Sequence, residues 1–412
     1  MLRTLAPSGS PIRLSELTTW LSTLAGGQDK SEELLEAVRN TFGVKHCLFF
    51  STGRAAMCFL FQHLHKFCSN VHRDEVVVPG YTCYSVASSV IMAGLKIRVC
   101  DIDPVTLSYD LEQLASVDFS RVLCVVTANL YGLPDELEKI EQLTNENKVY
   151  LVDDAAQSLG AMVAGRPSGT FGIAGLYSLD KGKNITSLQG GMIVTNNDAL
   201  AREMLLEFHS LGENSRSDNV KEYFKVLVYF FFLYPATYWI PSRLPFLNLG
   251  DTRYEDDYPI HKYPAALSPI ALAQLERYRL ITTQRVQAAR WYQQLLPEHP
   301  LIRPILPVIN TQPAWLRFPL RITGRRARAQ FLHLNGEMGC TGSYPKSISE
   351  IPEISNHLVV QNQQCEASAR IAREIVTLPT HAFVREKDVN AISHSLQMIL
   401  SNPNYSPSGL ST

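Results

Sequence analysis

Lys183 stands in a turn of small and polar residues, 180–184, with Ser178 five residues before it and the apolar segment Met192 to Thr195 shortly after it. A lysine amine can act as a nucleophile or, in its uncharged form, as a general base. A lysine taken alone is far more often a solvated surface charge. The turn therefore becomes a candidate site only if other elements bring complementary groups to it.

Two adjacent carboxylates form the second element. The apolar segment Val149 to Asp153 ends in Asp153 and Asp154, which lead through two alanines to Gln157. In open α/β sheets ligands bind at the carboxyl ends of the strands, so acids in this place are site candidates by position. Each is costly at a buried strand end unless it has a cationic or hydrogen-bonding partner. The alternative interpretation is that Asp154 caps the start of a helix.

The third element is the segment from Phe49 to Met57, an apolar strand end followed by a turn and the start of a helix. Thr52, Gly53 and Arg54 form that turn. Such an arrangement aims backbone N–H groups and the positive end of the helix at an anion, typically a phosphate.

Short apolar, β-branched runs alternate with helical patterns and must position these groups. The runs are Val76 to Pro79, Ile97 to Asp101, Val122 to Val126, Val149 to Asp153 and Met192 to Thr195. Between the third and fourth run, residues 134–143 have proline at the first helical position, acids in the first turn and one apolar face. Continuous apolar strands joined by helices predict an α/β fold, with a mainly parallel sheet covered by helices on both faces.

The pattern changes after about residue 255, where a long helix, Ser268 to Leu296, precedes a mixed region. We expect an N-terminal arm with helices over 1–44, a large domain over 45–255, and a linking helix with a small α+β domain over 256–412. The polar ends, Met1 to Pro11 and Ser401 to Thr412, are expected to be mobile.

Charge and cysteine usage limit the partners. The chain has 38 Lys+Arg against 39 Asp+Glu and a net charge of −1, whereas proteins that bind nucleic acid usually carry a cationic surplus. None of the eight cysteines falls in a metal-ligand or CxxC spacing, so we expect buried, reduced thiols and no metal site. The first residues, Met1 to Leu14, lack the long apolar core of a signal peptide. A cytoplasmic location is therefore expected.

In this order the three elements resemble the DegT/DnrJ/StrS family of pyridoxal-phosphate (PLP) aminotransferases, best known for aminating nucleotide-linked keto-sugars. The likeness runs from about Glu33 to Leu400, and its most specific parts are Asp153 to Gln157, Gly165 to Gly169 and Ser178 to Gly191. Further matching segments are Asp74 to Thr82, Ala93 to Leu107, Asn129 to Gly132 and Thr377 to Pro379. The resemblance implies the PLP-dependent transferase fold type I and a homodimer.

The resemblance also implies the catalytic roles. Lys183 would form the Schiff base with the cofactor aldehyde and then act as the base that moves the α-proton of an amino acid donor, expected to be L-glutamate. Asp154 would pair with the pyridine nitrogen and keep the ring cationic, which makes it an electron sink. Lys181 lacks the motif position and is interpreted as a surface charge. The acceptor would be a nucleotide-linked keto-sugar.

The cofactor-binding set implied by the resemblance surrounds these two residues. Gln157 would bond near the ring hydroxyl, and Ser178 would hold the phosphate together with the 52–54 turn. The remaining members of the set are Tyr81 or Thr82, close to the ring, and Asn184.

The chain departs from the family pattern at several positions. Arg54 replaces a threonine of the phosphate turn and either clamps the phosphate, the favoured interpretation, or recognises a substrate carboxylate. Gln189 stands where a glutamate is common. Cys83 replaces an aromatic residue that stacks on the ring, so either Tyr81 or Tyr84 takes its place or stacking is weaker.

An aromatic-rich insertion near 223–250 replaces the Asn-x-Arg segment with which relatives reach the neighbouring subunit. Its centre, Val226 to Ile240, is an uncharged run of 15 residues interrupted by Pro235, shorter than the ~20 residues that span a bilayer. A buried helix or a dimer contact is the favoured interpretation. Peripheral contact with a membrane or a lipid substrate is the alternative, because Tyr and Trp gather at headgroup level.

Two other functions stay open at this point. One is the same fold and cofactor acting on a non-sugar or lipid-linked ketone. The other is a catalytically silent regulatory homologue, which the intact set of Asp154, Ser178 and Lys183 disfavours. Lys183 also argues against the sugar dehydratases, which resemble this family but carry histidine there.

Overall fold

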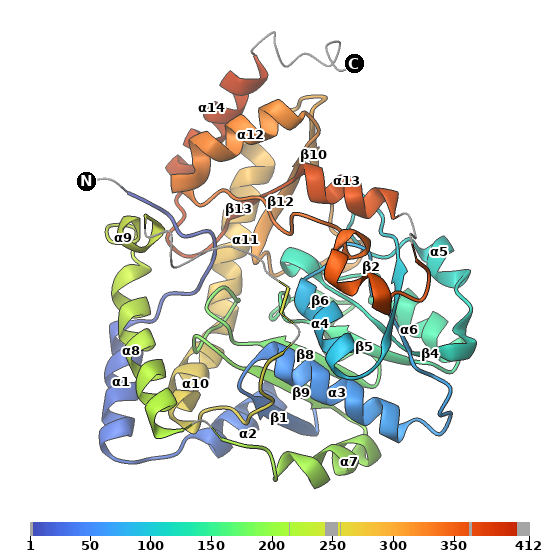
Figure 1. The fold of residues 1–412 in the computed structure, drawn as a ribbon. Helices are drawn as coiled ribbons and strands as arrows, with labels where there is room; N and C mark the ends of the chain where they lie inside the picture. The colour runs from blue at the N-terminus through green and yellow to red at the C-terminus, as the bar shows by residue number, and fades with distance from the viewer. Residues whose placement is uncertain (1–2, 214, 244–253, 256, 362–364, 402–412) are drawn as a thin grey trace.

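The computed structural model describes residues 3–213, 215–243, 254–255, 257–361 and 365–401 (Figure 1). Within this part of the chain, a seven-stranded sheet forms the centre of the molecule. Its strands, in spatial order, are β1 (His46–Phe50), β9 (Gly191–Thr195), β8 (Ala174–Ser178), β5 (Tyr150–Asp154), β4 (Val122–Val126), β2 (Glu75–Pro79) and β3 (Lys96–Cys100). The last five run parallel, whereas β9 is antiparallel to both β8 and β1.

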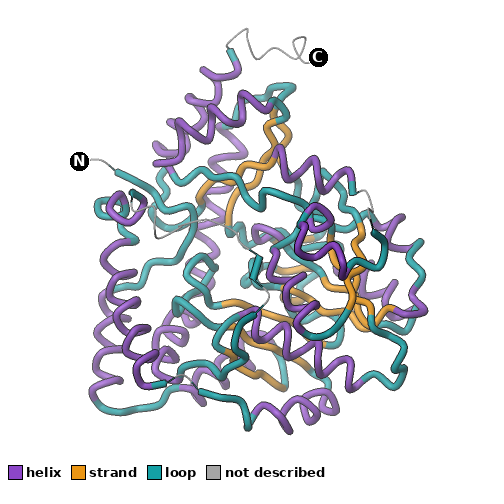
Figure 2. The backbone as a smooth tube through the Cα atoms, in the orientation of Figure 1, coloured by secondary structure: helices purple, strands orange, loops and turns teal. Residues whose placement is uncertain are grey.

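Helices cover both faces of this sheet, as Figure 2 shows with strands in orange between helices in purple. One face packs against α3 (Gly53–Phe67), α4 (Tyr84–Met92) and α7 (Asp198–Phe208). The other packs against α2 (Ser31–Phe42) and α6 (Leu137–Glu146), with α5 (Leu111–Ala115) near the edge. Every residue of β2 and β4 is buried, which is why these strands are uninterrupted apolar runs. The predicted α/β fold with a mainly parallel sheet is confirmed.

Helix α6 has the buried face that its apolar spacing predicts, but a different first residue. Its apolar positions Leu137 and Ile140 are fully buried against the sheet, as the spacing predicts. The helix begins at Leu137 after Glu136, so the prediction that Pro134 occupies the first helical position is wrong.

The aromatic-rich run folds mainly into α8 (Arg216–Phe232) and the short α9 (Trp239–Ser242). Helix α8 lies beside α1 (Leu14–Ala25), at the left in Figure 1, and packs with α1 and α10 (Ser268–Glu276) around the buried Val226. Its other face is open, because the Phe231 side chain is 59% exposed. No helix among the described residues has the length and apolarity needed to span a bilayer. Residues 244–253 of the expected insertion lie outside the described residues.

The C-terminal part begins with α11 (Tyr278–Leu295). The predicted single helix from 268 to 296 is two helices, because the backbone leaves helical geometry at Arg277. A second sheet of β10 (Ile302–Pro304), β12 (Arg317–Ile322) and β13 (Ile375–Pro379) packs with α12 (Arg325–Asn335), α13 (Glu366–Glu374) and α14 (Glu386–Leu400). A third, small sheet joins β11 (Thr311–Gln312) to β6 (Met162–Val163) and β7 (Arg166–Pro167). The short 3-10 helices are η1 (Phe119–Arg121), η2 (Leu130–Gly132), η4 (Ala265–Leu267), η5 (Gly336–Met338), η6 (Ile348–Glu350) and η7 (Pro352–His357).

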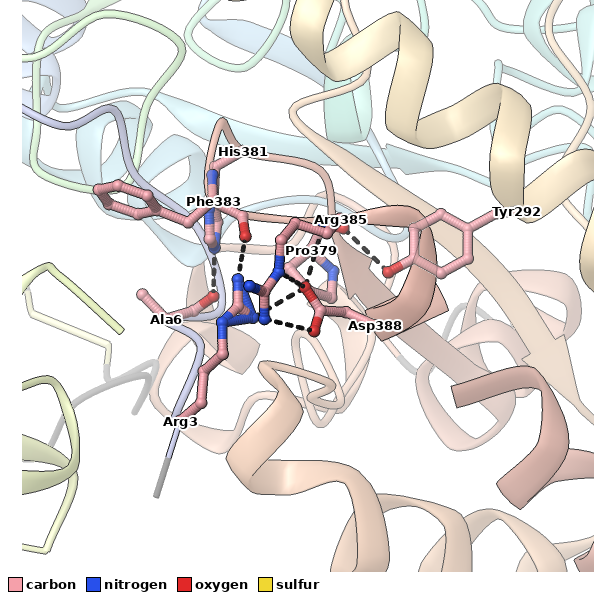
Figure 3. Close-up of polar contacts among 8 residues, drawn as sticks. All are labelled: Arg3, Ala6, Tyr292, Pro379, His381, Phe383, Arg385 and Asp388. Carbon is pink, nitrogen blue, oxygen red and sulfur yellow. Dashed lines mark hydrogen bonds and ion pairs between the residues drawn. The ribbon is translucent and has the colours of Figure 1, made fainter. Parts of the chain in front are cut away.

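The N-terminal arm, residues 3–12, contradicts the expectation of a mobile end. Leu5, Ala6, Ser10 and Ile12 are each at most 2% exposed. The arm is hydrogen-bonded to the C-terminal part, as Figure 3 shows for the bond between the His381 ring and the Ala6 carbonyl. Apolar burial and hydrogen bonding therefore order a segment whose Pro/Ser/Gly composition indicated a loose tail. Most of the other predicted mobile end, 402–412, lies outside the described residues.

Candidate active site

A cavity of about 610 Å³ opens where β5 and β8 end and α3 begins. Eight of the ten predicted site residues line it: Thr52, Gly53, Arg54, Thr82, Asp154, Gln157, Ser178 and Lys183. The three elements singled out in the sequence therefore meet in one place, as expected at the carboxyl ends of parallel strands.

The phosphate-type turn forms one wall of the cavity. Thr52 caps α3, because its side-chain oxygen accepts a hydrogen bond of 3.0 Å from the Ala55 N–H. A Cβ added to Gly53 would lie 3.4 Å from Ser178 Oγ, an ordinary contact distance, so the helix starts directly beside the end of β8. First-turn N–H groups have no partner inside a helix and carry its positive end. The wall is suited to an anion.

Arg54 has a partner that the sequence did not indicate. Its guanidinium lies 2.5 Å from Glu255 Oε2 and 5.1 Å from the centre of the Tyr258 ring. Glu255 itself lines the cavity. The structure therefore shows the Arg54 charge balanced by a carboxylate at the cavity wall.

The two adjacent acids have different surroundings. The Asp153 carboxylate accepts four hydrogen bonds, from Thr127 Oγ1, Asn129 Nδ2 and the Gly169 and Phe171 N–H groups. Burial nevertheless raises its pKa, with these four donors opposing the shift. Its hydrogen bonds are those of a group that fastens loops to the sheet.

Asp154 faces the cavity and has one side-chain hydrogen bond, from the Ala156 N–H at 2.9 Å. Burial raises the pKa of Asp154 to about 6, against the lowering effects of that bond and of the Lys183 charge. No helix begins at Asp154, because residues 156–160 form turns, so the capping interpretation is not borne out. An acid at a cavity wall with unused acceptor capacity is suited to a cationic ligand atom.

Lys183 lies in the excursion between β8 and β9, residues 179–190, and its N–H donates to the Asp180 carbonyl at 3.0 Å. The residue is half-buried and lines the cavity, whereas Lys181 is exposed. Lys183 and Asp154 are close enough for the lysine charge to influence the acid. The cavity thus places an amine near a buried carboxyl group.

Gln157 is held from two sides. Its Oε1 accepts from the Tyr131 N–H and its Nε2 donates to Tyr344 Oη, each at 2.9 Å. Tyr344 comes from the C-terminal part of the chain and also lines the cavity. The Gln157 amide is therefore fixed at the wall by residues from distant parts of the sequence.

Tyr81 and Asn184 do not line the cavity. Tyr81 is fully buried and its hydroxyl lies 3.3 Å from that of Tyr131, while Asn184 Nδ2 donates to the Leu159 carbonyl. Their contact with a cofactor stays a prediction. Of the two tyrosines considered for stacking, only Tyr84 lines the cavity, beside Cys83.

The residues present fit pyridoxal phosphate. The helix end and Ser178 suit its phosphate, Asp154 suits its ring nitrogen, and Lys183 suits its aldehyde. Within the described part of the chain, Gln189 Nε2 is a buried donor without a hydrogen-bond partner, on a residue that lines the same cavity. An unsatisfied buried donor is costly, which agrees with a wall built for a ligand.

The fold and the site together define a PLP-dependent aminotransferase. The chain belongs to the DegT/DnrJ/EryC1/StrS aminotransferase family, whose model matches residues 17–397. The resemblance inferred from the motifs is thereby confirmed, as is pyridoxal phosphate as the cofactor.

Individual proteins similar to this chain carry related activities in their names. GDP-perosamine synthase of Caulobacter vibrioides is 26% identical over 392 residues, covering 93% of this chain and 92% of that protein. The structure of PseC of Helicobacter pylori, an aminotransferase of pseudoaminic acid biosynthesis, matches with a TM-score of 0.77 and 19% identity over 97% of this chain and 99% of that chain. GDP-4-keto-6-deoxy-D-mannose-3-dehydratase of E. coli, with hydrated PLP, matches with a TM-score of 0.77 and 17% identity over 96% and 100%. At these identities the solved structures support the fold.

Sequence reasoning missed Tyr344 and Glu255 as wall residues. Tyr344 lies 187 positions from Gln157 in the chain, and Glu255 lies 201 positions from Arg54. No local period or motif connects such pairs, because the packing of the C-terminal part and the path of the insertion bring them together.

Proposed function

We propose that this protein transfers an amino group from L-glutamate to a nucleotide-linked keto-sugar. The observation that carries the proposal is the proximity of Lys183 to the buried Asp154 in one cavity beside the start of α3. Family membership supplies the reaction class, and the name of the perosamine synthase relative supports a sugar acceptor.

Bound in this cavity, pyridoxal phosphate supplies an aldehyde that condenses with amines and a ring that accepts electrons. The Thr52-Gly53-Arg54 turn, through its backbone N–H groups and the Arg54 guanidinium, would hold its phosphate together with the Ser178 hydroxyl. Asp154 holds a proton at the ring nitrogen by hydrogen bonding as a carboxylate. Gln157 would bond near the ring hydroxyl, and Thr82 would lie close to the ring.

Lys183 Nζ performs the proton transfers in this proposal. Once its amine is uncharged and free, it takes the α-proton of the donor amino acid and later returns a proton to the acceptor carbon. A positioned base of this kind contributes on the order of 10² to 10⁴ in rate. The turn must therefore hold the amine within reach of both carbon atoms.

The chain offers a matched pair of lysines for the test. The protein, loaded with pyridoxal phosphate, is treated with borohydride and its peptides are analysed by mass spectrometry. The adduct should sit on Lys183 in the wild type and in Lys181→Ala, and should vanish in Lys183→Ala. An adduct that persists in Lys183→Ala removes this lysine from its role.

Addition of L-glutamate should bleach the visible absorption of the bound cofactor, and a nucleotide-linked keto-sugar should restore it. Restoration by lipid-linked or simple ketones alone would favour the alternative acceptor class. No spectral change with any amino acid would favour a silent homologue.

We also propose that a second copy of this chain covers the exposed face of α8, and that the homodimer is cytoplasmic. Val220, Phe224, Val228 and Phe231 form an exposed apolar stripe at helical spacing. The lysines beside it, Lys221 and Lys225, are ion-paired with acids of the same helix, so little cationic charge remains for anionic lipid. All eight cysteines are free thiols, in keeping with a reducing compartment.

Light scattering tests this surface. Phe224→Asp with Phe231→Asp should yield monomers, whereas Leu206→Asp, an exposed apolar position on α7, should leave dimers intact. Dimers in both cases, with flotation of the wild type on lipid vesicles that the double variant loses, would assign the stripe to a membrane instead.

A further inference from the structure

The N-terminal arm reaches the turn that carries Lys183. Ser8 Oγ donates to the Gly182 carbonyl at 2.8 Å, and Ser10 Oγ donates to the Asn184 carbonyl at 2.5 Å. These two carbonyls belong to the residues immediately before and after Lys183. Hydroxyl groups from 174 positions away in the chain therefore hold the backbone on both sides of the reactive lysine.

Gly9 allows this close approach. Its φ of +131° lies in a region that other residues rarely adopt, and an added Cβ would lie 2.9 Å from Tyr229 Oη and 3.3 Å from the Lys181 carbonyl oxygen. Tyr229 Oη itself lies 3.1 Å from the Ser10 carbonyl and 3.0 Å from that of Lys181. With one proton it can donate to only one of them at a time. The phenol from α8 thus sits between the arm and the turn.

Arg285 holds the arm from α11. Its Nη2 donates to the Gly9 carbonyl at 3.0 Å and to Ser10 Oγ at 3.2 Å. The side chain is fully buried, and no ion pair with a carboxylate is seen for it among the described residues. A buried guanidinium is costly unless its donors are satisfied, so the arm carbonyl is a required partner for Arg285.

The outer end of the arm is fastened to the C-terminal part of the chain. Arg3 pairs with Asp388 at 2.8 Å and donates to the Phe383 carbonyl, and the His381 ring bonds the Ala6 carbonyl at 2.8 Å (Figure 3). The arm is therefore fixed at both ends: at Arg3 and Ala6 by the C-terminal part, and at Ser8 and Ser10 by the Lys183 turn.

We propose that Ser8, Gly9 and Ser10 are positioning residues that set the orientation of the Lys183 turn toward the cavity. The inference rests on the proposed role of Lys183. The arm touches the carbonyls of the turn rather than substrate, so its contribution is to fix the amine near its reaction geometry. Tyr229, from the aromatic-rich run, would help to hold the arm against the turn, because its hydroxyl lies between the Ser10 and Lys181 carbonyls.

Amide hydrogen exchange of the cofactor-free protein tests the arm directly. Ser8→Ala and Ser10→Ala should each speed exchange of peptides covering 179–187 by about fivefold, because each removes one hydrogen bond of about 1 kcal/mol to the turn. Exchange of β4 and β5 should stay unchanged. Ser22→Ala, which removes an exposed hydroxyl on α1, is the matched control and should leave the turn unaffected.

In the loaded enzyme the same variants should lower kcat about tenfold or more while the KM for the amino donor changes little. Unaltered exchange at 179–187 in both variants would overturn the proposal. So would faster exchange spread evenly over the whole chain, because that indicates a merely structural role. Should Ser10→Ala fail to fold, the half-buried Ser8 gives the same reading. Failure of Lys183 as the attachment residue appears separately, as borohydride labelling elsewhere, and leaves the exchange result intact.

Discussion

Asp153 and Asp154 are neighbours in sequence, but one has a structural role and the other faces the ligand site. The first has four hydrogen-bond donors and ties the 127–129 and 169–171 loops to the end of β5. The second has one donor and faces the cavity with a raised pKa. Successive side chains of a strand point to opposite faces, so one acid meets the loops while the next meets the ligand site.

Asp154→Asn should stabilise the cofactor-free protein at neutral pH. The pKa of Asp154 rises from 3.8 to about 6 on folding, so between these values the folded state holds a proton that the unfolded state has lost. The stability contributed by the protonated form is complete below pH 4 and is lost as pH rises through 6. The variant should gain on the order of 3 kcal/mol over wild type at pH 8, because one pKa unit corresponds to about 1.4 kcal/mol, and much less at pH 4. Denaturant titration at both pH values measures this, and an equal difference at each would contradict it.

Asp153→Asn should have the opposite effect. Each carboxylate oxygen accepts two hydrogen bonds, and either orientation of an amide would place its NH₂ group against at least one N–H donor. A buried donor left without an acceptor costs about 1 to 3 kcal/mol. The same denaturant titrations at pH 8 should show that loss. A neutral result would indicate that the two loops relax freely.

The residue types at the site could be predicted from sequence. Which acid fastens the loops and which faces the cavity could not. The run Asp153-Asp154 at a strand end marked both acids. The donors that separate them come from Thr127, Asn129, Gly169 and Phe171, and no pattern around residue 153 indicates which loops fold over it.

At the scale of elements, the site depends on two chain segments meeting without side chains between them. A Cβ on Gly191, the first residue of β9, would lie 2.5 Å from Gly53 Cα and 2.6 Å from Gly53 N. The glycine therefore lets the first residue of β9 touch the start of α3. The paired glycines before the last predicted strand were visible in the sequence, yet their partner was not, because the contact is between backbones 138 positions apart.

Gly191→Ala should displace the start of α3 and weaken cofactor binding. The new methyl group meets backbone atoms, which cannot rotate away, and overpacking of this kind costs about 1 to 3 kcal/mol. We expect at least a tenfold increase in the Kd for pyridoxal phosphate, measured by fluorescence titration. Gly336→Ala is the control, because a Cβ there meets nothing within 4 Å. Equal affinities in the two variants would show that the helix start tolerates the shift.

The molecule as a whole closes its site with residues from both ends of the chain. The five strands β2, β3, β4, β5 and β9 followed from local apolar runs, since such runs are what a sheet covered on both faces requires. The order of the arm and the place of Tyr344 could not be predicted in this way. Composition indicated a loose tail for the arm, and Tyr344 lies in a loop without a motif. Burial of the arm under α8 and α11 decides its order, and only the assembled fold contains that information.

Tyr344→Phe tests how far the C-terminal part controls the site. The substitution keeps the ring packed edge-on to Tyr81 and tilted to Tyr84 but removes the hydroxyl that accepts from Gln157 Nε2. Gln157 keeps its bond from the Tyr131 N–H, so its amide should turn more freely while the fold stays intact. One hydrogen bond of about 1 kcal/mol corresponds to roughly a fivefold weaker affinity for pyridoxal phosphate.

Tyr84→Phe is the comparison for this experiment, because the Tyr84 hydroxyl bonds the Lys346 backbone and not Gln157. It removes a link between the same two parts of the chain, so its cost should appear in the free energy of unfolding and not in cofactor affinity. Calorimetric unfolding of the cofactor-free variants, together with cofactor titration, separates the two effects. If both variants weaken binding equally, then closure of the C-terminal part, and not the orientation of Gln157, governs the site.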